Sequence, residues 1–226
     1  MKARGVFVTG TDTGVGKTRV AIALIHALRA RGLRVAAMKP VSAGSAPGEL
    51  NEDVVALVQA ANVRADLRDI NPYAFPEPVA PHIAAQQAHV HIDLDCVAAA
   101  YARLAAAADV VVVEGAGGWR VPLNEREDMA DLAQRLGLPI LLVVGLRLGC
   151  LNHAVLTAES IAQRPLPWAG WVGNQVDAAM IYSPENIAAL QVRLPDPCLG
   201  IQAHLRPTDP VATASQWLTL PANLVS

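Results

Sequence analysis

Short apolar runs alternate with longer amphipathic segments along the chain. The runs have the length and the β-branched content of strands and fall at residues 6–9, 33–41, 109–113, 139–145, 169–176 and 197–201. Apolar residues at helical spacing predict intervening and terminal helices at residues 17–31, 52–61, 95–107, 128–136, 153–163, 184–192 and 210–218. Residues 71–81 contain four prolines and predict a loop.

The runs at 110–113 and 138–144 are apolar at consecutive positions, as in strands that are buried on both faces. Such strands alternating with helices predict an α/β fold: a doubly wound, mainly parallel sheet with helices on both faces. We find no repeat, charge block or linker, and therefore expect a single domain over residues 1–226. Ligands of these sheets bind at the carboxyl ends of the strands, so the residues that follow each strand are the candidates for chemistry.

Composition narrows the class of protein. The 226 residues are 53% hydrophobic and 17% charged, which argues against intrinsic disorder. The net charge of −2 gives no general attraction to nucleic acid or to anionic lipid, so we expect neither partner. No run approaches the ~18 apolar residues of a membrane span, and no signal peptide is evident. Three cysteines without metal-site spacing fit a reducing compartment, so we expect a cytoplasmic protein.

A phosphate-binding loop follows the first predicted strand. Residues 9–18 read Thr-Gly-Thr-Asp-Thr-Gly-Val-Gly-Lys-Thr and open a predicted helix. Glycines allow close backbone approach, and the N–H groups at a helix start attract an anion. Lys17 is then expected to reach the β- and γ-phosphates, and the Thr18 hydroxyl to ligate Mg²⁺. The motif is a variant, because Thr11 replaces the usual first glycine. The alternative interpretation is an ordinary glycine-rich turn with a capping threonine.

Charged residues at other predicted strand ends suit the same chemistry. Lys39 follows the second strand, where it could neutralise a transferring phosphoryl group or be a surface lysine. Glu114 ends a run of four valines, the usual position of an acid that organises Mg²⁺, although a solvated strand end is the alternative. Asp53 lies at a helix start, where the dipole favours an acid in any case; on sequence alone that simpler explanation is preferred over a second Mg²⁺ carboxylate.

Two weaker signals complete the set of candidates. Residues 149–152 open another helix, whose free N–H groups suit a carboxylate or a phosphate. His89 and His91 have metal-ligand spacing, but no third ligand is evident nearby, so two partly exposed histidines are the preferred interpretation.

Taken together, these motifs resemble the dethiobiotin synthetase family of ATP-dependent enzymes with the P-loop NTPase fold. The similarity is carried by residues 8–18, 39–44, 71–82, 113–119 and 143–154, and more weakly by 170–176. It implies a homodimeric ligase of biotin biosynthesis that joins CO₂ to 7,8-diaminononanoate with ATP and Mg²⁺. A carbamate of one substrate amine attacks the γ-phosphate, and the second amine then closes the ureido ring.

The resemblance also implies roles for individual residues. Those expected to bind the nucleotide are Gly14, Val15, Gly16, Lys17, Thr18, Arg19, Asp53, Glu114, Gly115, Ala116 and Gly117, with Asn174 and Gln175 at the adenine. Thr18, Asp53 and Glu114 are the expected Mg²⁺ ligands, and Lys39 and Lys17 the catalytic residues. The expected substrate residues are Thr13, Ser42 and, from the partner subunit, Cys150, Leu151 and Asn152.

The chain departs from the family pattern at two places. Ala43 stands where the family usually has a hydroxyl residue, so the hydroxyl could come from Ser42 or be missing. The family's proline-containing adenine loop is not evident in residues 202–211, which leaves the nucleotide preference open. The alternative function is a nucleotide-switched ATPase of the partition or septum-site type. Those proteins carry an extra lysine where Asp12 stands here, which argues against that mechanism.

Overall fold

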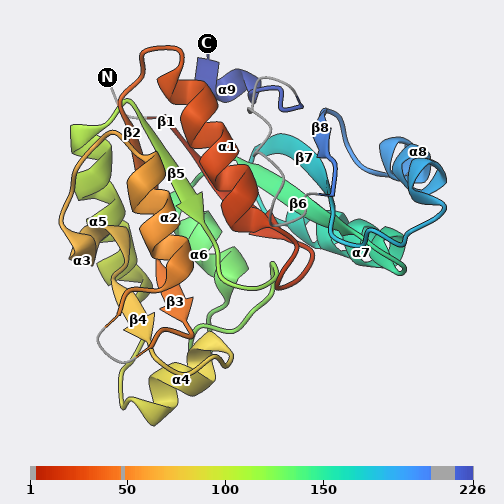
Figure 1. The fold of residues 1–226 in the computed structure, drawn as a ribbon. Helices are drawn as coiled ribbons and strands as arrows, with labels where there is room; N and C mark the ends of the chain where they lie inside the picture. The colour runs from red at the N-terminus through yellow and green to blue at the C-terminus, as the bar shows by residue number, and fades with distance from the viewer. Residues whose placement is uncertain (1–3, 47–48, 205–216, 226) are drawn as a thin grey trace.

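A six-stranded parallel sheet forms the centre of the structure (Figure 1). The computed structural model describes residues 4–46, 49–204 and 217–225. The strands are β1 (Arg4–Gly10), β2 (Val35–Met38), β5 (Val110–Glu114), β6 (Ile140–Leu146), β7 (Trp168–Gln175) and β8 (Cys198–Gln202). Their order is β2-β5-β1-β6-β7-β8, and every neighbouring pair is parallel. The predicted α/β sheet is therefore confirmed.

Helices cover both faces of the sheet because successive strand residues point to opposite sides. In β1, Val6 and Val8 pack with one cluster of apolar side chains, and Phe7 packs with the other. The first face is covered by α1 (Lys17–Arg29), α2 (Glu52–Ala60) and α9 (Ala222–Val225), and the second by α5 (Leu94–Ala107), α6 (Met129–Leu136) and α7 (Cys150–Ala162).

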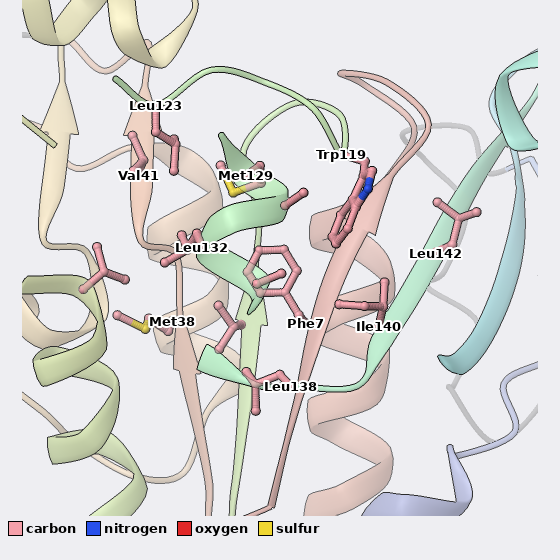
Figure 2. Close-up of a cluster of buried hydrophobic side chains, with 14 of the residues drawn as sticks. Phe7, Met38, Val41, Trp119, Leu123, Met129, Leu132, Leu138, Ile140 and Leu142 are labelled. Atoms are coloured by element: carbon pink, nitrogen blue, oxygen red, sulfur yellow. The ribbon is translucent and has the colours of Figure 1, made fainter. Parts of the chain in front are cut away.

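Phe7 lies inside the second cluster, which Figure 2 shows with side chains from β1, β6 and α6. Met129 and Leu132 come from α6, and Ile140 and Leu142 come from β6. All of these side chains are fully or almost fully buried. The cluster fixes the central strand between helices and so fixes the loop that follows β1.

The segment between β2 and α5 differs from the prediction. The expected strand at 33–41 is interrupted at Pro40, which has no N–H to donate. Residues after the interruption form β3 (Val41–Ala43), which pairs in parallel with β4 (Tyr73–Phe75) in a separate two-stranded sheet. The prediction that 71–81 is entirely loop was therefore wrong. Its prolines flank the three-residue strand β4 and do not occupy it, because a proline would remove a donor from the ladder.

Most predicted helices are present with shifted ends, and short ones were missed. The helix predicted from residue 153 begins at Cys150, and α8 (Ser183–Arg193) matches the expected 184–192. The helices α3 (Leu67–Ile70), α4 (Pro81–Gln87) and α9 were not predicted, since four to seven residues show too little periodicity. Most of the helix predicted at 210–218 lies outside the described residues. No helix in the described part of the chain is long and apolar enough to cross a membrane.

Gly145 of β6 packs against the loop that follows β1, through the side chain of Val15. A Cβ on Gly145 would lie 2.8 Å from Cγ1 of Val15, a side chain that is 1% exposed. Contacts this short force a displacement, and overpacking of a buried site costs about 1–3 kcal/mol.

We therefore predict that Gly145→Ala lowers the free energy of unfolding by about 1–3 kcal/mol, measured by urea denaturation. Gly118→Ala is the matched control, because a Cβ at Gly118 would meet nothing nearer than 3.6 Å. Equal stability of Gly145→Ala and the unmodified protein would show that Val15 is not held against β6.

Candidate active site

A cavity of about 480 Å³ opens at the carboxyl ends of the sheet strands. Its lining comes from segments that are distant in the sequence and follow β1, β2, β5, β7 and β8. The lining residues are Thr13, Gly14, Gly16, Lys17, Thr18, Arg19, Lys39, Asp53, Glu114, Gly117, Asn174, Gln175, Val176 and His204. Most of the predicted nucleotide-site residues are therefore brought to one place.

The loop after β1 has the backbone that anion binding requires. Gly14 and Gly16 have φ angles of 73° and 90°, a region that favours glycine. Gly16 caps α1 without any side-chain hydrogen bond to the helix start. A Cβ on Gly16 would lie 1.9 Å from Nδ2 of Asn174, so no larger residue fits beside β7. These features leave N–H groups at the start of α1 available to phosphate oxygens.

Lys17 and Lys39 both line the cavity, and both are largely buried. The ammonium of Lys17 donates to the carbonyl oxygen of Asp12 at 2.9 Å. The ammonium of Lys39 donates to Asp53 Oδ2 and to Glu114 Oε1, each at 2.6 Å. The possibility that Lys39 is a surface lysine is therefore wrong.

Thr18, Asp53 and Glu114 form one hydrogen-bonded group with Lys39. The Thr18 hydroxyl lies 2.7 Å from Asp53 Oδ1 and 2.9 Å from Glu114 Oε1. Asp53 is not the cap of α2, because Asn51 accepts the hydrogen bond from the Asp53 N–H. Asp53 does lie in the first turn of α2, as the dipole explanation expects, and its contacts with Lys39 and Thr18 add a second role that the sequence did not favour.

Burial and charge shift the pKa values of this group in different directions. Burial lowers the pKa of Lys17 to about 8, although Glu114 opposes the change. Burial also acts to lower the pKa of Lys39, but the charges of Glu114 and Asp53 outweigh it and raise that pKa. Burial raises the pKa of Glu114, against the effect of Lys39. Burial acts to raise the pKa of Asp53 as well, but Lys39 outweighs it and lowers that value.

The oxygen atoms of this group suit a hard divalent cation. Two carboxylates and a hydroxyl are the ligand types that Mg²⁺ prefers, with phosphate oxygens and water completing its shell. Glu114 Oε2 is buried and has no hydrogen-bond partner among the described residues, so one carboxylate oxygen is free to take a ligand. The described residues hold no cluster of three or more His, Cys, Asp or Glu side chains placed for a metal, His89 and His91 included.

On the side of β7 and β8, the cavity is lined by the amide of Asn174 and the imidazole of His204. Asn174 Nδ2 donates to the Val15 carbonyl at 2.9 Å, which ties β7 to the phosphate loop. Asn174 Oδ1 is buried, with no partner in the described part of the chain. Sequence reasoning missed Val176 and His204. Both follow strands by one or two residues, so the strand-end rule could have found them.

Several predicted residues lie outside the cavity lining. Val15 packs under the loop, and Gly115 faces Phe7 and Met129. Ser42 is 1% exposed, and its hydroxyl donates to Asn71 Oδ1 at 2.9 Å, so this hydroxyl is already used within the fold. The others outside the lining are Ala116, Cys150, Leu151 and Asn152. The last three begin α7, where the single chain does not bring them to the cavity.

Comparisons with known proteins agree with this geometry. A family model described as an AAA domain matches residues 4–211. The ATP-dependent dethiobiotin synthetase of Nitrosospira multiformis is 53% identical over 88% of this chain and 87% of its own length. The enzyme of the same name from Aromatoleum aromaticum is 51% identical over 96% of this chain and 98% of its own length.

Solved structures show a more distant likeness. The septum site-determining protein MinD of Pyrococcus horikoshii, complexed with Mg-ADP, has a TM-score of 0.57 and 19% identity over 88% of this chain and 80% of its own. A ParA family ATPase of Chlorobium tepidum has a TM-score of 0.53 and 17% identity over 90% of this chain and 84% of its own. At these identities the likeness concerns the P-loop fold alone. The high identity to the synthetases over nearly the whole chain shows that this protein belongs to the dethiobiotin synthetase family.

Proposed function

We propose that this protein uses ATP to join CO₂ to 7,8-diaminononanoate and close the ureido ring of dethiobiotin. Membership of the dethiobiotin synthetase family supports the overall reaction. The observation that carries the assignment within this chain is the group formed by Lys39, Asp53, Glu114 and Thr18 beside the phosphate loop. It supplies cationic and anionic groups where a phosphoryl group is transferred.

The loop from Gly14 to Arg19 is proposed to hold the ATP phosphates. The N–H groups at the start of α1 surround the phosphate oxygens, and Lys17 supplies a cation that is already buried. Gly117 borders the same space, and Gly115 and Ala116, which lie outside the lining, connect it to the end of β5. Asn174 and Gln175 stand at the wall where the adenine is proposed to lie.

Thr18, Asp53 and Glu114 are proposed to hold Mg²⁺. When bound there, Mg²⁺ neutralises the charge of the β- and γ-phosphates and aligns them for transfer. Glu114 provides the buried oxygen without a partner, and Asp53 provides a partly exposed one. The Thr18 hydroxyl lies between both carboxylates.

Lys39 and Lys17 are proposed as the catalytic residues. A substrate amine adds to CO₂ with loss of a proton, and the carbamate oxygen attacks the γ-phosphorus as ADP leaves. The second amine then attacks the carbamoyl carbon and loses a proton, and phosphate leaves. Negative charge accumulates on oxygens in each step, so two fixed ammonium groups in a buried site stabilise the transition states more than the ground states.

The diamine is proposed to lie near Thr13, with its carboxylate at the start of α7 of a second subunit. At the start of α7 the Cys150 N–H already donates to the Arg147 carbonyl oxygen, so the N–H groups proposed to bind the carboxylate are those of Leu151 and Asn152, which follow Gly149 with its φ of 92°. This arrangement requires a homodimer, which we propose together with a single-domain chain and a cytoplasmic location. A direct substrate contact by Ser42 is not part of the proposal, because its hydroxyl already donates to Asn71.

We predict that ATP turnover depends strictly on the diamine and on bicarbonate. The product to measure is dethiobiotin by mass spectrometry, with ADP measured in parallel at a one-to-one ratio. A partition-type ATPase would instead hydrolyse ATP without the diamine and respond to a protein or lipid surface. Such turnover, with no dethiobiotin formed, would reject the proposed reaction.

Lys39→Ala is expected to reduce the rate of dethiobiotin formation by about a thousandfold or more, while Mg-ADP still binds. The reason is that charge stabilisation by a positioned donor contributes about 10²–10³ in rate, and Lys39 acts in successive steps. Arg103→Ala is the matched control, since Arg103 pairs with Asp69 on the surface. Unchanged turnover in Lys39→Ala would remove this residue from the mechanism.

The affinity for ADP is expected to fall as pH rises above about 8, where free Lys17 loses its proton. Bound phosphates favour the ammonium form, so binding at this pH takes up a proton, and the affinity falls by up to about tenfold per pH unit. Calorimetry in two buffers of different ionisation heat measures the uptake. Lys17→Arg keeps its charge and should lack the dependence. A flat affinity from pH 7 to 9.5 would contradict a phosphate contact by Lys17.

A further inference from the structure

The sheet order gives the cavity two chemically different sides. Glu114 ends β5 and Lys39 follows β2, on one side of β1. Asn174 and Gln175 are the last residues of β7, and His204 follows β8, on the other side. Strands are spaced by about 4.8 Å, so β7 lies about 10 Å from the phosphate loop at β1. A nucleotide with its γ-phosphate at the charged side therefore has its base toward β7 and β8.

His204 is held in place by Gln175. The backbone N–H of His204 donates to Gln175 Oε1 at 3.2 Å, and its ring Nδ1 lies 3.1 Å from the Gln175 carbonyl oxygen. The Gln175 side chain is itself fixed, because Nε2 donates to Ser183 Oγ at 2.8 Å and Ser183 is 5% exposed. The imidazole therefore has a defined position at the wall of the cavity, although His204 is exposed to solvent.

The contact with Gln175 also determines which ring nitrogen carries the proton. A carbonyl oxygen only accepts hydrogen bonds, so Nδ1 must be the donor. In the neutral ring Nε2 is then an acceptor. Among the described residues no hydrogen bond to Nε2 is present. An acceptor at this wall can receive a hydrogen bond from an exocyclic amine, whereas it repels a carbonyl oxygen.

We propose that His204 determines base specificity by accepting a hydrogen bond from the 6-amino group of adenine through Nε2. The proposal rests on the proposed use of ATP and adds a selection of 6-aminopurine over 6-oxopurine nucleotides. The Asn174 side chain offers no competing donor, since its Nδ2 already donates to the Val15 carbonyl oxygen. This side of the cavity thus offers Nε2 of His204 as an acceptor and no competing donor from these two side chains.

The test compares adenine with hypoxanthine, which differ at the 6-position by an amine against a carbonyl. Calorimetry measures the affinities for Mg-ADP and Mg-IDP, and kcat/KM is measured with ATP and ITP. His204→Phe keeps a ring but loses the acceptor, and His204→Gln places an oxygen acceptor close to the position of Nε2. His91→Phe is the matched control, because His91 is an exposed histidine outside this cavity.

We expect His204→Phe to weaken ADP binding by about three- to tenfold, the effect of one hydrogen bond, and to strengthen IDP binding, because the repulsion of the 6-carbonyl oxygen is removed. His204→Gln should retain most of the preference. An unchanged ADP-to-IDP ratio in His204→Phe, or an equal loss for both nucleotides, would overturn the assignment. Because binding is measured directly, this failure is distinct from a failure to form dethiobiotin, which would instead reject the proposed reaction.

Discussion

The buried ion pairs of Lys39 are the interaction on which the site depends. Lys39 and Glu114 are 6% and 1% exposed in their side chains, and a lone charge at such depth would be strongly unfavourable. The ammonium contacts both Glu114 and Asp53, so Lys17 and Lys39 face two carboxylates in one cavity. Because the positive and negative charges are equal in number, charged residues can be buried at the ends of apolar strands. The same balance suits a polyphosphate that binds together with a divalent cation. The anionic phosphates and the cation then enter the cavity as a pair of opposite charges.

The central position of β1 explains why one cavity collects so many segments. β1 lies between β5 and β6, and its loop rests on Gly145 of β6 through Val15. Glu114 ends the neighbouring strand β5, while Asn174, one residue before the end of β7, donates to the Val15 carbonyl. The phosphate loop is therefore held by β6 on one side and by Asn174 of β7 on the other. A change in either support alters the loop without touching a catalytic atom.

Much of the fold follows from local patterns in the chain. The valine run before Glu114 and the glycines before Lys17 determine a buried strand and a phosphate loop, because these patterns leave few other conformations. Thr18, Lys39 and Glu114 could be proposed from their positions after strands. The short strand β4 and the helices α3 and α4 could not, since a few residues beside prolines carry no periodic signal.

By itself, the sequence determined the alternation of strands and helices, the phosphate loop and the family resemblance, because these depend on neighbouring residues and on motif spacing. Only the tertiary structure decided that Asp53 contacts Lys39 and Thr18, that the Ser42 hydroxyl is used by Asn71, and that His204 lies beside Gln175. Each of these facts depends on how chain crossovers bring strand ends together. Thr18 and Asp53 are 35 positions apart and meet because α1 and α2, whose first turns hold them, pack on the same face of the sheet.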